Sequence, residues 1–450
     1  MAIKEKITDF FEKYTQTLNG EKDTYLFSLR EKSIKLFQEL GIPTLKNEEW
    51  KYTKLNFLNS IDFELSNSPL KTMPDNFQIS DYYIDNFEGN ILVFINGFFS
   101  DQFSRIINTK DDLIISNLNE AKAKYPDIIQ SYLSKYTDEN NNPFTALNTA
   151  LSNDGAVIII PENSVSNLPI HFLFINLPDN KNIITNTRNI IIVDSNSKAQ
   201  IIETNHSIGD YSSFHNSVTE IFIKQNADVE YYKFQNESNS AYYIGTTQIH
   251  QERDSKLLST TISLGGKFIR NNLNSILDGE NGEAYFNGLY FIGNEDFVDN
   301  HTLADHAKPH CNSNENYKGI IDGKATAVFN GKIMVRPYAQ KTNAYQSNKN
   351  ILLSEDATIN TKPQLEIFAD DVKCSHGATS GFLNRDAIFY FRARGIDEKT
   401  AQSYLLNSFS SDIIETIRND SLRDLIKSEV AKKLSMNDLY FCSILESNKI

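Results

Sequence analysis

The fold is decided by a stretch such as residues 189–204, NIIIVDSNSKAQIIET, in which two apolar runs flank a short polar segment. Runs rich in β-branched residues are typical of buried strands, and the Ser-Asn-Ser-Lys segment is typical of a turn. Between about residues 156 and 372 the chain repeats this arrangement in AVIIIP, IHFLFINL, VTEIFIK, VEYYKFQ, LSTTISL, EAYFNGLYFI, TAVFNGKIMV and QLEIFAD. Helical periodicity is almost absent there, so we expect a β body.

The turns of this region recur at a nearly regular spacing. They end at Ala199, Ala227, Ser255, Ala284, Ala325 and Ala357, with steps of 28, 28, 29, 41 and 32 residues. Such a period with strands inside each unit is typical of a β-solenoid, in which each turn buries its apolar face against its neighbours. The longest step contains residues 301–311, which are therefore expected to form an inserted loop. A large antiparallel sandwich is the alternative.

The N-terminal part is predicted to be helical or mixed. Apolar residues recur every three or four positions in residues 7–18 and 26–40, and the second series ends at Gly41. Asn96-Gly97 separates two strand-like runs and predicts a hairpin. A short helix is expected in residues 144–155, and the only tryptophan, Trp50, is expected to be a packed aromatic residue.

Helical patterns return after Gly381. Asn384 and Asp397 are candidate N-caps of two helices, and Leu422, Leu425, Ile426, Val430 and Leu434 form the apolar stripe of a third. The sequence thus predicts an N-terminal helical or mixed domain at 1–150, a β core at 151–378 and a C-terminal helical domain at 379–450.

Composition narrows the class of protein. The 450 residues carry a formal charge of -14, which argues against a nucleic-acid partner, because nucleic-acid binding requires clustered Lys and Arg. The three cysteines, at 311, 374 and 442, are too few for a disulfide framework. The sequence shows neither a secretory signal nor an apolar run of about 20 residues. We therefore expect a cytoplasmic protein that does not enter a membrane.

Several common catalytic motifs are missing from the sequence. Gly323-Lys324 and Gly331-Lys332 are not followed by Ser or Thr, so the phosphate-binding P-loop is absent. The sequence also lacks a G-x-G-x-x-G fingerprint, a G-x-S-x-G elbow and a CxxC pair. Any ATP that this protein uses must therefore be bound by another chain.

Residues 301–311, HTLADHAKPHC, are a first candidate metal site. His301, His306, His310 and Cys311 offer imidazole and thiol groups, which suit zinc or iron. Their spacing matches no known zinc finger, and a hydrogen-bonded loop explains them equally well. If they bind a metal, the protein is a stand-alone metal-dependent enzyme.

Residues 369–378, ADDVKCSHGA, are the second candidate. If Val372–His376 continues the preceding strand, Cys374 and His376 share one face, with Cα atoms about 6.5 Å apart. Two ligands do not complete a metal site, so another segment or another chain would have to supply the rest. A cysteine nucleophile with a histidine base and a purely structural pair are the alternatives.

Residues 328–396 include the segments NTKPQLEIFADDVKCSHGAT and FYFRARGI, and this stretch closely resembles the core of the SufB/SufD family of SUF iron–sulfur cluster assembly proteins. Upstream, HTLADH and CNSNENYKG are similar to the same family. NEEWKYTKL at 47–55, VFINGFF at 93–99 and FTALNTAL at 144–151 resemble the N-terminal domain of its SufD branch.

This resemblance implies a right-handed parallel β-helix between helical end domains. It also implies a non-catalytic scaffold that pairs with SufB and binds the SufC ATPase at its C-terminal helices. For the chain alone, a homodimer and a monomer are both compatible with the sequence. A transient iron–sulfur cluster would be built at the contact with SufB, with His376 and Cys374 as ligands from this chain, since imidazole and thiolate both bind iron in clusters. The resemblance implies a structural role for the residues at 301–311. The family is also associated with reduced flavin.

Overall fold

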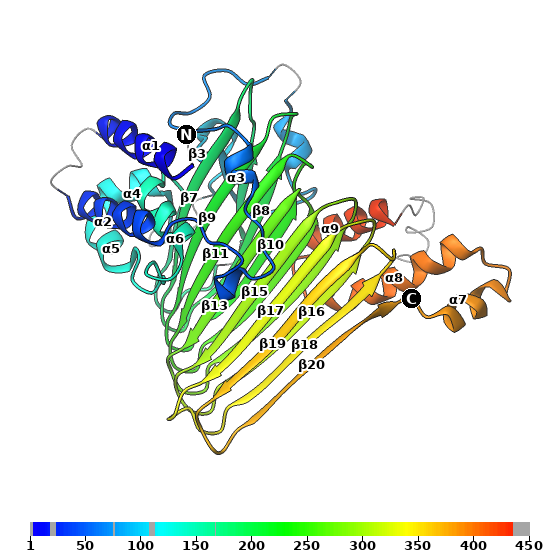
Figure 1. Cartoon of the computed structure of the whole chain (residues 1–450). Helices are drawn as coiled ribbons and strands as arrows, with labels where there is room; N and C mark the ends of the chain where they lie inside the picture. The colour runs from blue at the N-terminus through cyan, green and yellow to red at the C-terminus, as the bar shows by residue number, and fades with distance from the viewer. Residues whose placement is uncertain (1–2, 19–23, 75–76, 108–112, 167, 435–450) are drawn as a thin grey trace.

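The computed structural model describes residues 3–18, 24–74, 77–107, 113–166 and 168–434 (Figure 1). The helices are α1 (Ile3–Thr17), α2 (Tyr25–Leu40), α3 (Phe57–Ser60), α4 (Leu118–Lys124), α5 (Pro126–Tyr132), α6 (Pro143–Leu151), α7 (Arg385–Arg392), α8 (Glu398–Ile414) and α9 (Asp420–Lys433). The third cysteine, at position 442, lies outside the described residues.

The strands form two parallel stacks. One sheet contains β5 (Ala156–Ile160), β7 (Asn182–Val193), β9 (Ser213–Ile223), β11 (Ala241–Gln251), β13 (Phe268–Leu277), β15 (Phe297–His306), β17 (Thr326–Val335) and β19 (Thr358–Ile367). The other contains β6 (Ile170–Asn176), β8 (Lys198–Ser207), β10 (Asp228–Asn236), β12 (Lys256–Gly265), β14 (Glu283–Ile292), β16 (Asn312–Ile321), β18 (Asn343–Leu352) and β20 (Lys373–Phe382). Because consecutive strands alternate between the sheets, the core is a parallel β-helix with two strands per turn, as predicted, and not a sandwich.

Register partners show the true repeat of the β-helix. Equivalent positions of successive turns are occupied by Ala199, Val229, Leu257, Ala284, Ser313, Ala344 and Cys374, which are 27 to 31 residues apart. The 41-residue step in the turn spacing is therefore no insertion. The earlier turn residues lie at or near the start of strands in the second sheet, whereas Ala325 and Ala357 precede strands of the first sheet, half a turn away. The expectation of an inserted loop at 301–311 was wrong, because residues 301–306 are the second half of β15.

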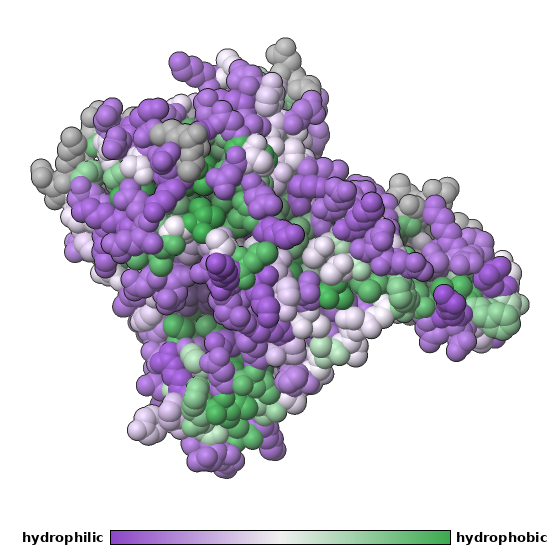
Figure 2. Space-filling view, viewed as in Figure 1, coloured by the Kyte–Doolittle hydropathy of each residue, from purple (hydrophilic) through white to green (hydrophobic). Residues whose placement is uncertain are grey.

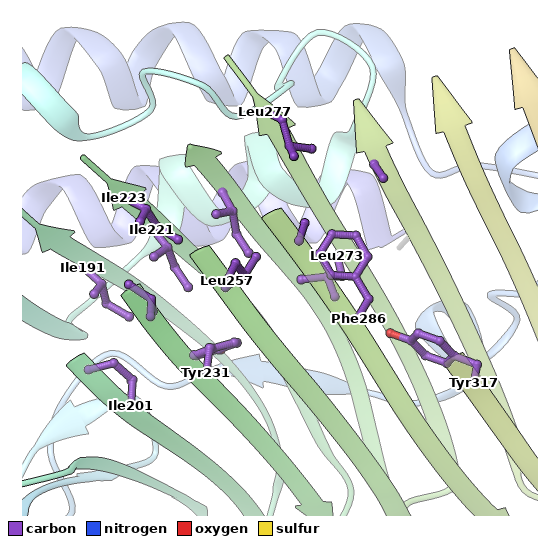
Figure 3. Packing of buried hydrophobic residues seen from close by; sticks show 14 of the residues in the cluster. Ile191, Ile201, Ile221, Ile223, Tyr231, Leu257, Leu273, Leu277, Phe286 and Tyr317 are labelled. Carbon is purple, nitrogen blue, oxygen red and sulfur yellow. The ribbon is translucent and has the colours of Figure 1, made fainter. Parts of the chain in front are cut away.

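The interior of the β-helix is filled by inward side chains of both sheets. Figure 3 shows labelled members of this cluster, such as Ile221 and Leu273 from the first sheet and Tyr231 and Phe286 from the second, lying between the strands. Apolar side chains of successive turns pack against one another in this cluster, which stabilises the stack of turns. The cluster continues to the last turn, where Cys374 packs against it.

The N-terminal part covers the outer face of the first sheet. A hydrophobic cluster joins α1, α2 and α6 to Ile184, Phe214 and Phe268 of that sheet. This part also contributes strands: β1 (Phe63–Leu65) and β4 (Ile114–Asn117) pair with the first sheet, and β2 (Asn90–Ile95) and β3 (Phe98–Phe99) extend the second. The predicted hairpin is confirmed, with Asn96 and Gly97 in the left-handed conformation that its turn requires.

The C-terminal helices α8 and α9 cover the outer face of the second sheet. Ile413 and Ile426 pack against residues such as Phe234 and Leu289. The predicted caps are confirmed: Asn384 accepts from the amides of residues 386 and 387, and Asp397 accepts from that of residue 400. The N-terminal part and the C-terminal helices thus cover two opposite sides of the β-helix, and its last turn is left uncovered (Figure 1).

The buried carboxyl group of Glu237 destabilises the folded protein, and the size of this effect depends on pH. Neither of its carboxyl oxygens has a hydrogen-bond partner among the described residues, and burial raises its pKa to about 8. The folded protein therefore keeps a proton on Glu237 that the unfolded chain releases above about pH 4.5, and the contribution of this group to the free energy of unfolding falls by about 1.4 kcal/mol per pH unit up to pH 8.

The Glu237→Gln variant is expected to lack this slope. Its free energy of unfolding should exceed that of the parent by up to about 3 kcal/mol at pH 7 and equal it below pH 4.5. Urea unfolding of both proteins at several pH values checks this. Equal stability of the two proteins at pH 8 would contradict it.

Candidate functional site at the open end of the β-helix

The last turn of the β-helix leaves two strand edges free. Within the described chain β19 pairs with β17 alone, and β20 pairs with β18 alone (Figure 1). The amide of Lys373 donates to Thr342, and amides alternate in direction along a strand, so those of Cys374, His376 and Ala378 point to the free edge. A free strand edge is a template for pairing with another chain.

Cys374 and His376 are presented at this open end. Their register partners in β18 are Ala344 and Gln346, both buried in the interior, so both side chains belong to the inward face of the last turn. Cys374 is half-buried, whereas His376 is exposed because no further turn covers it. The sequence-based expectation that the two residues share a strand face is confirmed.

The strand that carries them differs from the expected one. β19 ends at Ile367, and the chain then turns and enters the second sheet as β20. Val372–His376 therefore does not continue the preceding strand. β20 runs on to Phe382, so the site lies near the start of a full edge strand.

The chemistry of Cys374 does not favour an activated nucleophile. Burial raises the pKa of its thiol above the ordinary value. An activated cysteine needs the opposite shift, since the thiolate is the reactive form. A thiol of this kind becomes a thiolate readily only when a metal ion replaces its proton.

A buried polar cluster lies directly beneath His376, and sequence reasoning missed it. Glu315 of β16 accepts hydrogen bonds from the hydroxyl of Thr302 (2.7 Å) and the amide of Gln346 (2.9 Å). Burial raises the pKa of Glu315 to about 7. The signal that would have found these residues is the repeat itself, because Glu315, Gln346 and His376 occupy one register position of three successive turns.

The described residues of the open end do not form a complete metal site. Among the described residues no three His, Cys, Asp or Glu side chains are grouped so that they could hold a metal ion. The last turn presents one thiol, of Cys374, and one imidazole, of His376, on its inward face. The expectation that another chain completes the set stays a prediction.

The His-rich segment does not form a site. His301 lies near Asp299 (3.0 Å) and Glu49 (3.3 Å), on the face of β15 that meets the N-terminal part. His306 is five residues further along the strand and faces the interior, where it bonds to Ser313 (2.9 Å) and burial lowers its pKa to about 4. The two imidazoles thus point to opposite faces of one sheet.

The remaining two members of the segment are equally separate. His310 is exposed in a turn with φ 63°. Cys311 is buried and its thiol donates to the carbonyl of Gly279 (3.2 Å), while burial raises its pKa to about 11. The structure therefore gives no support to a stand-alone metal enzyme built on residues 301–311.

The segment of residues 47–55 packs between the N-terminal part and the β-helix. Trp50 is buried, with the guanidinium of Arg270 3.8 Å from its ring centre and Phe144 at 5.3 Å. Arg270 also pairs with the buried Asp299 (2.5 Å). This confirms Trp50 as a packed aromatic residue at the seam between the N-terminal part and the β-helix.

No helix in the described part of the chain combines the length and the apolar character that crossing a membrane requires.

Comparisons with known proteins agree with this architecture. Residues 176–409 match the model of the SUF system FeS cluster assembly SufBD core domain, and residues 1–172 match that of the SufBD protein N-terminal region. An iron–sulfur cluster assembly SufBD family protein of Synechocystis is 33% identical over 422 residues, covering 92% of both chains.

Two further relatives are similar over most of the chain, and one of them is named SufD. The iron–sulfur cluster assembly protein SufD of Escherichia coli is 28% identical over 396 residues, with 88% of this chain and 90% of that protein covered. The chloroplastic protein ABCI7 of Arabidopsis thaliana is 29% identical over 413 residues, covering 89% and 85%. The chain therefore belongs to the SufB/SufD family of the SUF iron–sulfur cluster assembly system and is a homologue of SufD.

Proposed function

We propose that this chain is a non-catalytic scaffold subunit of cytoplasmic iron–sulfur cluster assembly. It pairs through its open end with a SufB subunit, and the nascent cluster is built between the two chains as their product. His376 supplies an imidazole ligand, and Cys374 supplies a thiolate or holds sulfur or iron in transit. The observation that carries the proposal is the uncovered last turn, which presents both side chains beside two free strand edges.

The free edges support pairing with a second β-helix. Exposed edges are normally blunted or covered, because they invite association. Here the edge strand β20 spans ten residues and remains open along its length. A partner strand added to this edge would satisfy the outward amides and bring its own ligands to Cys374 and His376.

The C-terminal helices support a second contact, with the SufC ATPase. None of the residues of α7 is buried, and Phe389 and Tyr390 are 73% and 56% exposed. A hollow of about 560 Å³ lies between α7, α8 and the end of β20, lined by residues such as Phe382 and Ile388. Exposed aromatic side chains around a hollow are typical of a protein-binding surface.

We assign no residue of this chain to the binding of reduced flavin.

The test is to co-produce the chain with its SufB and SufC partners and replace His376 with Ala. The side chain is exposed at the last turn, so its removal should leave the fold intact and the complex should form normally. Cluster assembly, followed by visible absorption and by iron and sulfide content, should fall at least tenfold, since an incomplete ligand set does not retain iron.

His310→Asn is the matched control. It removes another exposed imidazole of the same β-helix, and Asn tolerates the left-handed backbone at that turn. The control should assemble clusters at the parent rate. Unimpaired assembly in the His376→Ala complex would refute the assignment of the site.

A further inference from the structure

One column of inward side chains ends at His376. Glu315 in β16, Gln346 in β18 and His376 in β20 are register partners in consecutive turns. Neighbouring strands are about 4.8 Å apart, so each residue of the column lies directly above the previous one. Glu315 and Gln346 are fully buried, and His376 is the exposed last member.

Gln346 is held in one orientation. Its amide nitrogen donates to a carboxylate oxygen of Glu315 (2.9 Å), which also accepts from Thr302 (2.7 Å) of the opposite sheet. Opposite Gln346 lies Gly331, where an added Cβ would come within 2.3 Å of the amide nitrogen. The missing side chain at Gly331 thus makes room for the Gln346 side chain. The hydrogen bond to Glu315 fixes which end of the Gln346 amide group faces that carboxylate.

This orientation leaves an acceptor facing the open end. With the nitrogen committed to Glu315, the carbonyl oxygen of Gln346 has no hydrogen-bond partner among the described residues, although the side chain is buried. A buried acceptor without a donor is costly, so a donor is expected nearby. The residue one turn further along the column is His376, and the step from Gln346 to His376 repeats the register of the bonded pair below it.

We propose that Gln346 is a positioning residue for His376. The two side chains are not hydrogen-bonded in this structure, and a rotation of the exposed His376 side chain brings a ring N–H to the Gln346 carbonyl oxygen. This hydrogen bond fixes which ring nitrogen carries the proton and leaves the other nitrogen free to bind iron. Histidines that bind metals commonly donate their second ring nitrogen in this way. The inference rests on the proposed function, in which His376 is a ligand of the nascent cluster.

The test compares the parent chain with Gln346→Met, which keeps the volume and removes the acceptor. Both are labelled with ¹⁵N in their histidine rings, and the His376 signals are identified by their loss in His376→Ala. The parent should show the widely separated ring shifts of a single tautomer. The variant should show the averaged shifts of a freely exchanging ring, and its complex with the partners should assemble clusters at least fivefold more slowly.

Asn348→Leu is the control for general loosening of the last turns. Asn348 is also buried in β18 and bonds to Tyr290 and Tyr317, but its register partner is Ala378, which has no ring. It should leave the His376 ring shifts unchanged. Identical shifts in the parent and Gln346→Met, or equal changes in both variants, would overturn the inference. Normal assembly in His376→Ala would instead refute the proposed function, while the ring shifts would still decide the hydrogen bond.

Discussion

Replacing Ala378 with proline is expected to prevent stable pairing of this chain with the SufB subunit that we propose as its partner, while leaving the chain folded. Ala378 lies in the middle of β20, and its amide points to the free edge. Proline removes that donor and places its ring where an added strand would lie. Loss of one hydrogen bond between uncharged groups, about 1 kcal/mol, alone weakens a complex about fivefold, and the steric clash of the proline ring adds to this.

The chain itself already shows that such a position accepts proline. Pro363 lies in the middle of β19. The backbone amides of residues 358 and 368 donate to carbonyls on the β17 side, and amides alternate in direction along a strand, so the backbone nitrogen of residue 363 faces the free edge. The thermal unfolding temperature of Ala378→Pro should therefore change little. Co-purification and sedimentation with the partner measure the pairing.

The neighbouring Thr379→Pro variant is the control for this prediction. Its amide points toward β18, so proline there should disrupt the last turn and lower the unfolding temperature. A complex of parent affinity with Ala378→Pro would show that the partner does not extend β20.

Replacing Arg188 with methionine is expected to lower the free energy of unfolding by about 3–5 kcal/mol. Arg188 and Glu220 are each 1% exposed and form an ion pair at 2.6 Å between β7 and β9. The guanidinium also donates to Thr149 of α6 (3.0 Å) and to Ser134 (2.9 Å). Removing it leaves a carboxylate buried without its counter-charge and removes two hydrogen bonds between the N-terminal part and the first sheet.

A second variant separates the unpaired charge from lost packing. Adding Glu220→Gln to Arg188→Met removes the unpaired negative charge of Glu220. The double variant should therefore recover part of the free energy of unfolding that Arg188→Met loses. Lys198→Met, which breaks the exposed pair with Asp228 at 3.7 Å, should change stability by less than about 1 kcal/mol. Denaturant unfolding measures all three. A loss below about 1 kcal/mol for Arg188→Met would contradict the assigned role of the pair.

Local chemistry explains why much of the fold is predictable. Helix ends are set by caps such as Asn384, and the hairpin by Asn96-Gly97, and both signals act within a few residues. The period of the β body is also visible, because every turn must bury the same inward positions. Cys374 and His376 were predicted to share a face by strand geometry alone, and they do.

Register explains what was not predictable. The apparent insertion at 301–311 arose because turns into the first sheet and turns into the second sheet carry similar residues, so local pattern does not tell them apart. The strands β1, β2 and β4 pair with parallel or antiparallel partners at least 39 residues away, and the sequence near these strands does not indicate which segments those partners are. Glu315 and Gln346 were missed for the same reason, since only the register places them below His376.

The most direct test of the central claim is spectroscopic. The complex is built from this chain carrying ¹⁵N only in its histidines and an unlabelled partner, and the newly assembled cluster is reduced and studied by pulsed electron paramagnetic resonance. The account predicts a ¹⁵N hyperfine coupling to the cluster that disappears in His376→Ala. A cluster formed in full yield without any ¹⁵N coupling from this chain would contradict it.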